Sequence, residues 1–517
     1  MYRKALPALM AVASLLVTSP ATAAVTAAAG ATASQDTVDV APGVTLTRLT
    51  LGAKNDDDFW TVHVYLPATI DGPLNRAATA LGPREIADRV AATLREKGFE
   101  PRVEQVDLPA FADRPAGVLG WVVRVGRYAT AADAAAGLAR IKAAGLTGGT
   151  RYTAQDGTDA AAPQRVHVLR VDFRRFRGTV DTDFGPTLSG METLTDLMAS
   201  TGAVAGVNAQ WFLNSSPTGL YVKDGRLIGS ATQGRGGIRI TQGGRRLEAD
   251  AYTAHVTLRV GRDTVEIDGV NRLPGEIWNC GGVGGDLPTE QPQHDFKCTD
   301  PSELVRFTPE WGTPPSGAGA EAVLDARGKV LAVNGTRGAA VPAGGSTVQA
   351  IGDSAGWLLA HASVGARLTV TERVEDSRGR RVPLTPDTTI LQVGPTLVRD
   401  GQVSVNAAAD GIIRDGADQT FTYNWTVRAN PRSMVGLDER GRLLLVVVDG
   451  RQDGYSEGLG IARAAELMRG LGAVEAMNLD GGGSSVMATA QSGIVNRPSD
   501  ATGQRALGNV LLVRPGR

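Results

Sequence analysis

Residues 443–485 restrict the possible fold of this chain more than any other stretch. Leu443 to Val448 is an unbroken run of Leu and Val, which predicts a buried central strand. The apolar spacing over about 459–471 predicts a helix, and Ala476 to Leu479 predicts a second strand. A strand, a crossover helix and a second strand predict two parallel strands with a right-handed crossover.

Each predicted strand is followed directly by an acidic residue. Asp449-Gly450-Arg451 follows the first, and Asp480-Gly481-Gly482-Gly483-Ser484-Ser485 follows the second. Because parallel strands end at one edge of a sheet, we expect both acids to project from the same rim. Neighbouring strands lie about 4.8 Å apart and an intervening strand doubles that, so retaining and inverting glycosidase geometries both remain open. The triple glycine predicts a backbone nest that binds an anion.

Plainer interpretations and one rival motif compete with the carboxylate pair. An Asp-Gly after a strand is often only a turn, and a glycine run is often only a flexible loop. Gly454-Tyr455-Ser456-Glu457-Gly458 matches the nucleophile elbow of α/β-hydrolases. However, Ser456 lies well beyond the predicted strand tip, and all 5 histidines precede it although a triad histidine should follow. We therefore favour the carboxylates.

Length and charge set the broad class of the protein. A chain of 517 residues should form two or three domains, and its net charge of −1 attracts neither nucleic acid nor acidic membranes. The N-terminus combines basic residues, an apolar run and Ala21-Thr22-Ala23, which predicts a signal peptide over 1–23 and export. That run is too short for stable membrane insertion. Residues 24–45 are expected to be a flexible lead-in.

The predicted export bears on the state of the cysteines, and the acidic residues raise the question of a metal site. Cys280 and Cys298 are the 2 cysteines of the chain, and outside the cell they are expected to form a disulfide worth about 3 kcal/mol. Two free thiols are the alternative. Asp449 and Asp480 could hold an oxygen-preferring cation such as Ca²⁺, but the spacing does not require one, so we assign no metal ligand and no cofactor.

Residues 46–160 are predicted to form a separate domain with the element order β-α-β-β-α-β. The segment 60–64, Trp-Thr-Val-His-Val, and the segment 121–128, Trp-Val-Val-Arg-Val-Gly-Arg-Tyr before an Ala-rich helix, resemble the SPOR domain. That resemblance implies binding to the glycan strands of peptidoglycan. An unrelated ferredoxin-like dimerisation domain or pro-domain is the alternative.

Residues 165–517 resemble the phosphodiester glycosidase family in the order of their motifs. The similar segments are Ala205–Phe212, Gly269–Arg272, Phe307–Gly312, Val393–Val398, Val448–Arg451, Asn478–Ser485 and Val495–Pro498. The chain has Ala209-Gln210 where the family commonly has Gly-Gly, and Asn430-Pro431-Arg432-Ser433 where it has His-Pro-Arg-Thr. We therefore expect an α+β protein, with a ferredoxin-like βαββαβ SPOR-type module followed by a larger mixed α/β phosphodiester glycosidase domain.

The family resemblance implies hydrolysis of the bond between a sugar's anomeric carbon and a phosphodiester. Asp480 is our first choice for the key acid, Asp449 the second and Glu457 an outside candidate. Guanidinium groups match phosphate oxygens, so arginines are expected to bind the phosphate, with amide, hydroxyl and glycine groups around the sugar phosphate. These expected binding residues are Asn208, Arg432, Arg451, Asn478, Gly481, Gly482, Gly483, Ser484, Ser485 and Arg497.

The preferred interpretation is a secreted or cell-wall-associated hydrolase of glycopolymers joined through sugar-1-phosphate. Its expected partners are a sugar-phosphodiester substrate and peptidoglycan, and neither nucleic acid nor a membrane. A non-catalytic wall-glycan-binding protein that keeps the pocket is one alternative, favoured by the substitutions in the family motifs. A hydrolase of another glycan bond, using the same carboxylates, is a second.

Overall fold

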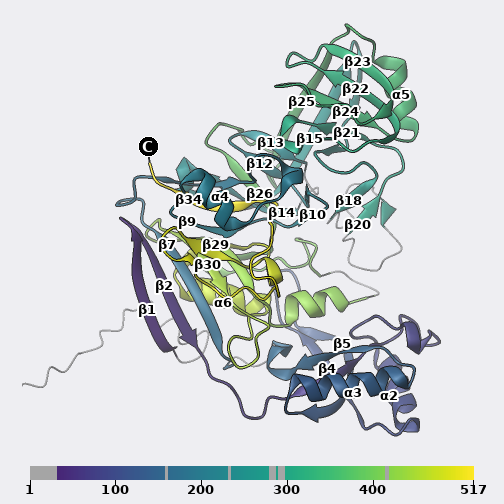
Figure 1. The fold of residues 1–517 in the computed structure, drawn as a ribbon, viewed down its shortest axis with the longest axis vertical. Coiled ribbons are helices and arrows are strands. Elements are labelled where there is room, and N and C mark those ends of the chain that lie inside the picture. The colour runs from purple at the N-terminus through teal and green to yellow at the C-terminus, as the bar shows by residue number, and fades with distance from the viewer. Residues whose placement is uncertain are drawn as a thin grey trace, which may run out of the picture.

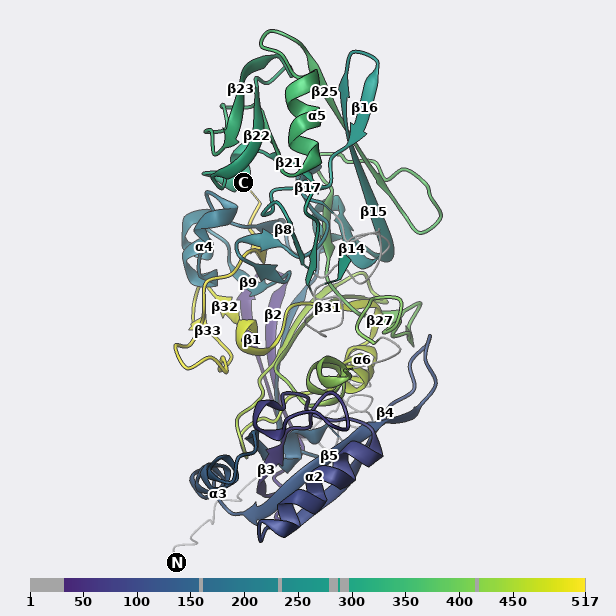
Figure 2. The same ribbon diagram turned by 90° about the vertical axis from the view of Figure 1, so that its right-hand side faces the viewer.

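The computed structural model describes residues 32–157, 161–230, 235–278, 287–288, 297–413 and 418–516. Three parts follow one another along the long axis of the molecule (Figures 1 and 2). A small domain of β3–β6 lies at one end, a large central sheet lies in the middle, and a strand-rich part built around β15–β25 lies at the other end. The expected signal peptide, residues 1–23, and Cys280 fall outside the described residues.

The central sheet has the strand order β1-β2-β7-β30-β29-β31-β27-β28, and neighbouring strands are antiparallel. The strands are β1 (Thr32–Ala41), β2 (Val44–Leu51), β7 (Gln164–Val171), β30 (Leu443–Val448), β29 (Arg432–Asp438), β31 (Ala473–Asn478), β27 (Thr396–Arg399) and β28 (Gln402–Val403).

The prediction that β30 and β31 are parallel is confirmed. β29 lies between them and is antiparallel to both, so the axes of β30 and β31 are roughly 10 Å apart. Arg432 begins β29 opposite Val448, the last residue of β30, and Met434 lies opposite Asn478, the last residue of β31. One edge of the sheet therefore carries the two strand ends with their acids and, between them, an arginine.

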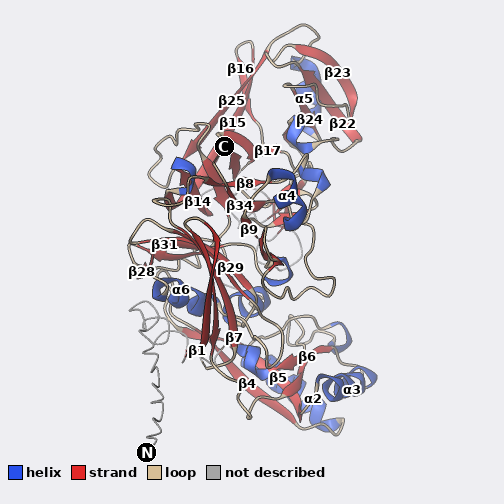
Figure 3. Cartoon of the chain, turned by 60° about the vertical axis from the view of Figure 1, so that its left-hand side comes forward, coloured by secondary structure: helices blue, strands red, loops and turns tan. Residues whose placement is uncertain are grey.

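The central sheet is covered on both faces. Helix α6 (Ile461–Gly470), where the sequence predicted a helix, packs on the side of Leu444 and Val446 (Figure 3). The opposite face, including Leu445 and Val447, packs on a second sheet of order β33-β32-β9-β34-β8. Because both faces are covered, every residue of β30 is buried, which explains its uninterrupted Leu and Val.

The second sheet is short and carries α4 (Leu194–Thr201) on its outer side. Its strands are β8 (Thr179–Asp183), β9 (Ala205–Asn208), β32 (Met487–Thr489), β33 (Gly493–Ile494) and β34 (Val510–Arg514). β9 pairs with both β34 and β32, so the Asn208 segment lies against the chain that follows Asp480.

The remaining strands build the far end of the molecule, where α5 (Asp353–His361) covers one sheet. One sheet contains β12 (Tyr221–Lys223), β13 (Arg226–Gly229), β14 (Arg235–Thr241), β15 (Arg246–Val260), β16 (Asp263–Glu266), β25 (Leu368–Glu375) and β26 (Thr389–Gln392). Another contains β17 (Gly269–Val270), β21 (Leu304–Phe307), β22 (Gly317–Leu324), β23 (Val330–Arg337) and β24 (Ser346–Ala350). Small pairings join β10 (Phe212–Leu213) to β11 (Ser216–Pro217), and β20 (Lys297–Thr299) to β18 (Glu276–Trp278) and β19 (Leu287–Pro288).

The small domain has the predicted element order. Its elements are β3 (Trp60–Val64), α2 (Arg84–Glu96), β4 (Pro101–Leu108), β5 (Gly117–Tyr128), α3 (Ala131–Ala143) and β6 (Gly148–Tyr152), with the sheet order β4-β5-β3-β6. Both helices pack on one face of this sheet, through Val62, Val64, Val123 and Val125. The helices lie on the side turned away from the rest of the chain (Figure 1).

Two expectations about the N-terminal part are wrong. The predicted flexible lead-in, 24–45, forms β1 and the start of β2 from Thr32 onward. The small domain was expected to begin at residue 46, but β2 pairs with β7 and belongs to the central sheet. The polar sequence of β1 hid this strand, because β1 lies at the sheet edge and pairs only with β2.

The helix-free face of the small domain is covered by the large one. His63 is fully buried, and its ring lies 6.0 Å from that of Tyr423 in the π-helical turn η6 (Thr422–Val427). Arg124 is also buried and donates to the Tyr423 hydroxyl at 3.2 Å. Val122 packs in the same apolar cluster as Tyr423 and Val427. The two domains therefore share a continuous interface.

None of the helices in the described part of the chain is both long and apolar enough to cross a membrane.

Candidate active site

Asp449 follows β30 and lies in a buried hydrogen-bond network. Its Oδ1 accepts from the backbone N–H of Arg497 at 2.9 Å and from Asn496 Nδ2 at 3.0 Å. Its Oδ2 lies 3.2 Å from His167 Nε2 and accepts from the Tyr455 hydroxyl at 3.4 Å. The residue is 1% exposed, so protein groups occupy its carboxylate. This geometry gives Asp449 a positioning role, in which it holds the 496–497 segment against the end of the strand.

Asp480 follows β31 at the same edge, and the residue is half-buried. Its Oδ1 accepts from the Gly481 N–H at 2.8 Å. Burial raises the pKa of this carboxyl to about 6, although the Ser484 hydroxyl, the Gly481 N–H and the charges of Arg505 and Arg451 act in the opposite direction. A carboxyl with this pKa exchanges its proton near neutral pH, as a catalytic acid or base must.

Asn208 holds the backbone around Asp480. Its Nδ2 donates to the carbonyl oxygen of Asp480 at 2.7 Å. Its Oδ1 accepts from the Ser433 hydroxyl at 2.6 Å and from the Val486 N–H at 3.1 Å, and the Asp480 N–H donates to the oxygen of Ala209. Asn208 is 1% exposed. The geometry therefore assigns its amide to positioning the Asp480 loop, whereas the sequence had suggested contact with substrate.

The glycine-rich loop does not form the predicted nest of free N–H groups. Most of its N–H groups bind the protein itself: Gly481 to Asp480 Oδ1, Gly482 to the oxygen of Pro431, Ser484 to that of Gly481, and Ser485 to that of Gly482. Ser485 is fully buried, and its Oγ has no partner. The loop is a tight turn that keeps few donors for an anion.

The glycines instead allow two arginines to approach the backbone. A Cβ on Gly482 would lie 3.2 Å from Arg451 Nη2, and the φ of Gly482 is +61°, where other residues are strained. A Cβ on Gly483 would overlap the Arg505 guanidinium, which is held by Asp500 at 2.6 Å. Positive charge thus reaches the Asp480 loop from side chains, and Arg505 is a site residue that the sequence analysis missed.

Arg432 is a fully buried cation at the start of β29. Its Nε donates to the oxygen of Leu459 at 2.8 Å, its Nη2 donates to the oxygen of Trp425, and its guanidinium lies 4.6 Å from the Trp425 ring centroid. Nη1 has no partner. Burial, with the nearby charge of Arg451, lowers the pKa to about 9. The group is therefore charged at neutral pH, yet no carboxylate of the described chain pairs with it.

Arg451 and Arg497 lie on the two loops that flank Asp449. Arg451 has a left-handed backbone, φ 59°, and its Nη2 and Nε donate to Asn430 Oδ1 at 2.8 and 3.1 Å. Arg497 is exposed and its guanidinium lies 5.0 Å from the Tyr455 ring centroid. Both remain accessible to an anionic ligand. Asn430, which stands where the family has His, accepts both donors from Arg451.

Asn478 and Glu457 are buried and bind other parts of the chain. Asn478 Nδ2 donates to the oxygen of Gly394 at 3.2 Å. Glu457 accepts from Gln155 Nε2 at 3.0 Å and from the Gly454 N–H at 2.7 Å, and burial raises its pKa. Glu457 thus connects the loop after Asp449 to the small domain, a placement that favours positioning over a role as second acid.

Ser456, the serine of the rival motif, is buried with its hydroxyl occupied. Its Oγ donates to the oxygen of Asp449 at 2.7 Å and accepts from the Arg165 N–H at 3.0 Å. Replacing Ser456 by Ala should lower the free energy of unfolding by about 1–3 kcal/mol, because two buried backbone groups lose their partner. Turnover should stay within about threefold of wild type, as expected for a residue outside the chemistry. Loss of turnover from a folded variant would instead support a serine nucleophile.

Two tryptophans provide an aromatic surface near the acid. The Trp211 and Trp425 rings are 5.3 Å apart in a T-shaped arrangement, and Phe421 stacks on Trp425 at 6.0 Å. Both tryptophans are partly exposed. Trp211 follows Ala209, whose oxygen binds the Asp480 N–H, so these rings can pack against the apolar face of a sugar.

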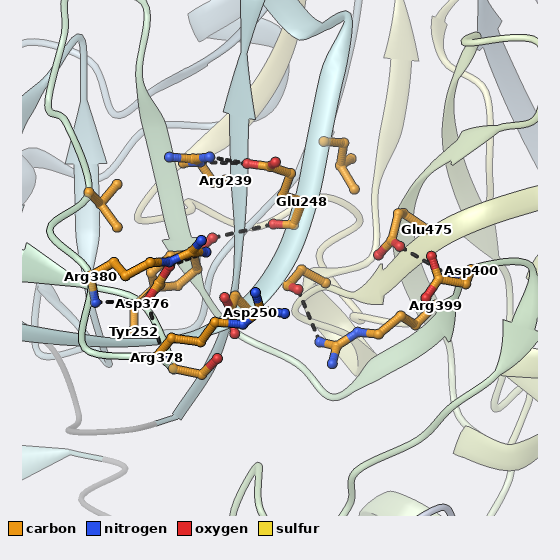
Figure 4. A pocket seen from close by; sticks show the side chains of 14 residues that line it. Arg239, Glu248, Asp250, Tyr252, Asp376, Arg378, Arg380, Arg399, Asp400 and Glu475 are labelled. Atoms are coloured by element: carbon orange, nitrogen blue, oxygen red, sulfur yellow. Dashed lines mark hydrogen bonds and ion pairs between the residues drawn. The ribbon is translucent and has the colours of Figure 1, made fainter.

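A cavity of about 340 Å³ lies among β14, β15 and the start of β31 (Figure 4). It contains Glu475 of β31, whereas Asp480 follows the other end of that strand. Two of its arginines pair with carboxylates: Arg239 Nε lies 2.8 Å from Glu248, and Arg380 Nη2 lies 2.7 Å from Asp376. Its charges are largely balanced within the protein. Near Asp480, Arg505 also has an acidic partner, Asp500, but Arg432 and Arg451 pair with no carboxylate of the described residues.

No group of three or more His, Cys, Asp or Glu side chains within the described ranges is arranged to hold a metal ion. Both oxygens of Asp449 face protein donors, an arrangement that does not favour the Ca²⁺ considered from the sequence. Cys298 is buried on β20. Because Cys280 lies outside the described residues, the disulfide stays a prediction.

Comparisons with known proteins find two segments of the chain similar to known families. Residues 318–514 match the phosphodiester glycosidase family, and residues 77–151 match the SPOR domain. The Mus musculus N-acetylglucosamine-1-phosphodiester alpha-N-acetylglucosaminidase is 31% identical over 119 residues, which are 23% of this chain. The chain spans only 22% of the length of that curated relative.

Two crystal structures share the overall architecture. A Burkholderia pseudomallei K96243 protein named as an exported protein superposes with a TM-score of 0.82 at 32% identity, over 93% of this chain and 96% of that one. A Synechocystis protein has a TM-score of 0.52 at 15% identity, over 92% of this chain and 75% of its own, and supports the fold alone.

Proposed function

We propose that this chain, which joins a SPOR domain to a phosphodiester glycosidase segment, hydrolyses the bond between a sugar's anomeric carbon and a phosphodiester. Water adds to the anomeric carbon, the bond from that carbon to the phosphate oxygen breaks, and a phosphate monoester leaves. The observation that carries the proposal is Asp480, a carboxyl with a raised pKa at a sheet edge lined with arginines.

The residues around Asp480 suit each part of such a substrate. Arg451 and Arg505 lie next to the glycine turn and can bind the phosphate through the guanidinium donors that Asn430 and Asp500 leave free. Their charge stabilises the leaving phosphate, so the reaction does not require a strong general acid. Asp480 then stabilises the positive charge that develops at the anomeric carbon or activates the attacking water. Trp211 and Trp425 offer an aromatic surface to the sugar ring.

The residues that depart from the family motifs form hydrogen bonds within the site, which argues against a protein that has lost turnover. Ser433 donates to Asn208, and Asn430 accepts from Arg451. Gln210, at a family glycine position, is buried and donates to the oxygens of Leu220 and Gln392. These substitutions supply structural contacts and leave Asp480 and its arginines in place.

We further propose that the protein acts in the cell envelope on glycopolymers or their precursors. The SPOR match supports peptidoglycan binding, and the name of the Burkholderia pseudomallei relative, which calls it an exported protein, supports export. The covered sheet face, with His63 and Arg124 buried, implies that glycan strands bind elsewhere on the SPOR domain.

The test is release of N-acetylglucosamine from a p-nitrophenyl diester of N-acetylglucosamine-1-phosphate by the purified full chain. We expect release from this diester and little from the simple p-nitrophenyl glycoside of the same sugar. Binding without release would favour the glycan-binding alternative, and faster cleavage of the simple glycoside would favour a different glycosidase.

The pH dependence should report Asp480 directly. If the ionised carboxylate is the active form, kcat/KM should rise about tenfold per pH unit below pH 6 and level off above it. Folding raises this pKa from 3.8 to about 6, so the carboxyl contributes stability below pH 3.8, and this contribution is lost as the pH rises through 6. A rate that instead falls above pH 6 would assign Asp480 as a general acid.

A further inference from the structure

We propose that the SPOR domain contributes to the active site: Arg151 of β6, together with Arg428, binds a second phosphate carried by the aglycone of the substrate. The inference rests on the proposed function and narrows the substrate to glycosyl phosphodiesters whose aglycone bears a further phosphate, as in a diphosphate.

The end of the SPOR sheet lies directly against the loops that carry the arginines. After β6 the chain forms the turn η2 (Thr153–Asp156), where Gln155 Nε2 donates to Glu457 at 3.0 Å. The oxygen of Gln155 accepts from the Ala429 N–H at 3.1 Å. Gly157 packs so closely on segment 427–428 that a Cβ at this position would overlap the backbone oxygen of Val427. These contacts hold β6 beside segments 428–432 and 450–457.

The arginines at this junction have unused donors. Nε of Arg151, Nε of Arg428 and Nη1 of Arg432 are buried without hydrogen-bond partners. Within the described ranges, no carboxylate lies at ion-pair distance from any of these three or from Arg451. Arg124, on the same SPOR sheet, differs from these arginines because it forms ion pairs with Asp156 at 2.6 Å and with Glu104 at 3.1 Å.

The unpaired guanidinium groups are close enough to repel one another. Burial lowers the pKa of Arg428 to about 10, with the charge of Arg151 as the next cause. Burial also lowers the pKa of Arg451, followed by the charges of Arg505 and Arg151. Asn430 joins the two segments, because its Oδ1 accepts from Arg451 and its Nδ2 donates to the oxygen of Arg428 at 3.0 Å. Like charges held close together are unfavourable until an anion binds, most of all for the buried Arg428 and Arg432.

One phosphodiester does not satisfy this set. It has a single negative charge and two non-bridging oxygens, which Arg451 and Arg505 can occupy beside Asp480. Arg151, Arg428 and the fully buried Arg432 remain, and of these Arg151 and Arg428 lie on the side of the SPOR domain. A second phosphate on the aglycone supplies the missing charge and acceptors.

Calorimetric titration of the full chain with inorganic pyrophosphate and inorganic phosphate tests the site without turnover. Wild type should bind pyrophosphate about tenfold or more tightly than phosphate, because two anionic groups are held. Arg151→Gln and Arg428→Gln should each weaken pyrophosphate binding about tenfold and change phosphate binding less than about twofold. Arg140→Gln, an exposed position on α3, is the matched control and should change neither.

The outcomes separate this inference from the proposed function. If pyrophosphate binds no better than phosphate, or if both arginine variants bind it like wild type, the inference is wrong even when the phosphodiester is cleaved. If binding follows the expected pattern but no substrate is cleaved, the anion site stands and the proposed function fails. If thermal unfolding shows that Arg151→Gln is not folded, Arg151→Lys replaces it in the test. Lysine keeps the positive charge but not the two-pronged guanidinium geometry, so this variant is expected to lose part of the preference for pyrophosphate.

Discussion

The variant Asp480→Asn is expected to lose turnover, with kcat/KM lowered by about 10³-fold or more, while the protein stays folded. Asn has nearly the same shape and keeps an oxygen that can accept from the Gly481 N–H. It cannot carry the negative charge that stabilises the reacting sugar or activates water. Since ionised Asp480 is disfavoured by burial, as its raised pKa shows, the free energy of unfolding at pH 7 should be unchanged or higher.

The measurement is release of sugar from the phosphodiester, with thermal unfolding recorded for the same preparations. Asp453→Asn is the matched control, because Asp453 is an exposed carboxylate on the loop after Asp449, and it should stay within about twofold of wild type. Residual turnover above about a tenth of wild type in Asp480→Asn would place the key carboxylate elsewhere and would remove the basis of the mechanism.

The edge of the sheet that carries this chemistry could be predicted from the sequence, because the signals are local. Six buried residues of β30, the helix α6 and the second strand lie within one short segment, and their order alone implies a common rim. The intervening strand β29 could not be placed in this way, since its pairing on both sides depends on the whole fold. Arg432 was found by its motif, but its burial without a carboxylate could be seen only in the structure.

The sequence-based predictions were wrong where one local pattern is compatible with two different structures. The triple glycine suggested an anion nest, whereas the loop binds its own N–H groups and uses the missing Cβ atoms to admit Arg451 and Arg505. Thr32–Ala41 seemed a flexible lead-in because it is polar, yet an edge strand needs little apolar surface. The contact between Gln155 and Glu457, 302 positions apart, left no signal in either segment.

The second large effect is expected at Asp449, where stability and activity should fall together. Asp449→Ala leaves the Arg497 N–H, Asn496 Nδ2 and the Tyr455 hydroxyl without their buried acceptor. Loss of such a network should cost about 3 kcal/mol or more in the free energy of unfolding and lower the Tm by roughly 6 °C or more. Turnover should also drop, because the freed 496–497 segment no longer holds Arg497 beside the site.

Asp449→Asn distinguishes positioning from direct chemistry at this residue. The amide keeps one oxygen for the Arg497 N–H but presents a donor to the Tyr455 hydroxyl or to Asn496, so part of the network should survive. If Asp449 acts only through its neighbours, the Asn variant should be both more stable and more active than the Ala variant, by matching degrees. Its pH profile, which Asp480 sets, should keep its midpoint near 6. A stable Asn variant that is as inactive as Asp480→Asn would mean that the Asp449 carboxylate reaches the substrate, which requires the 496–497 segment to move when substrate binds.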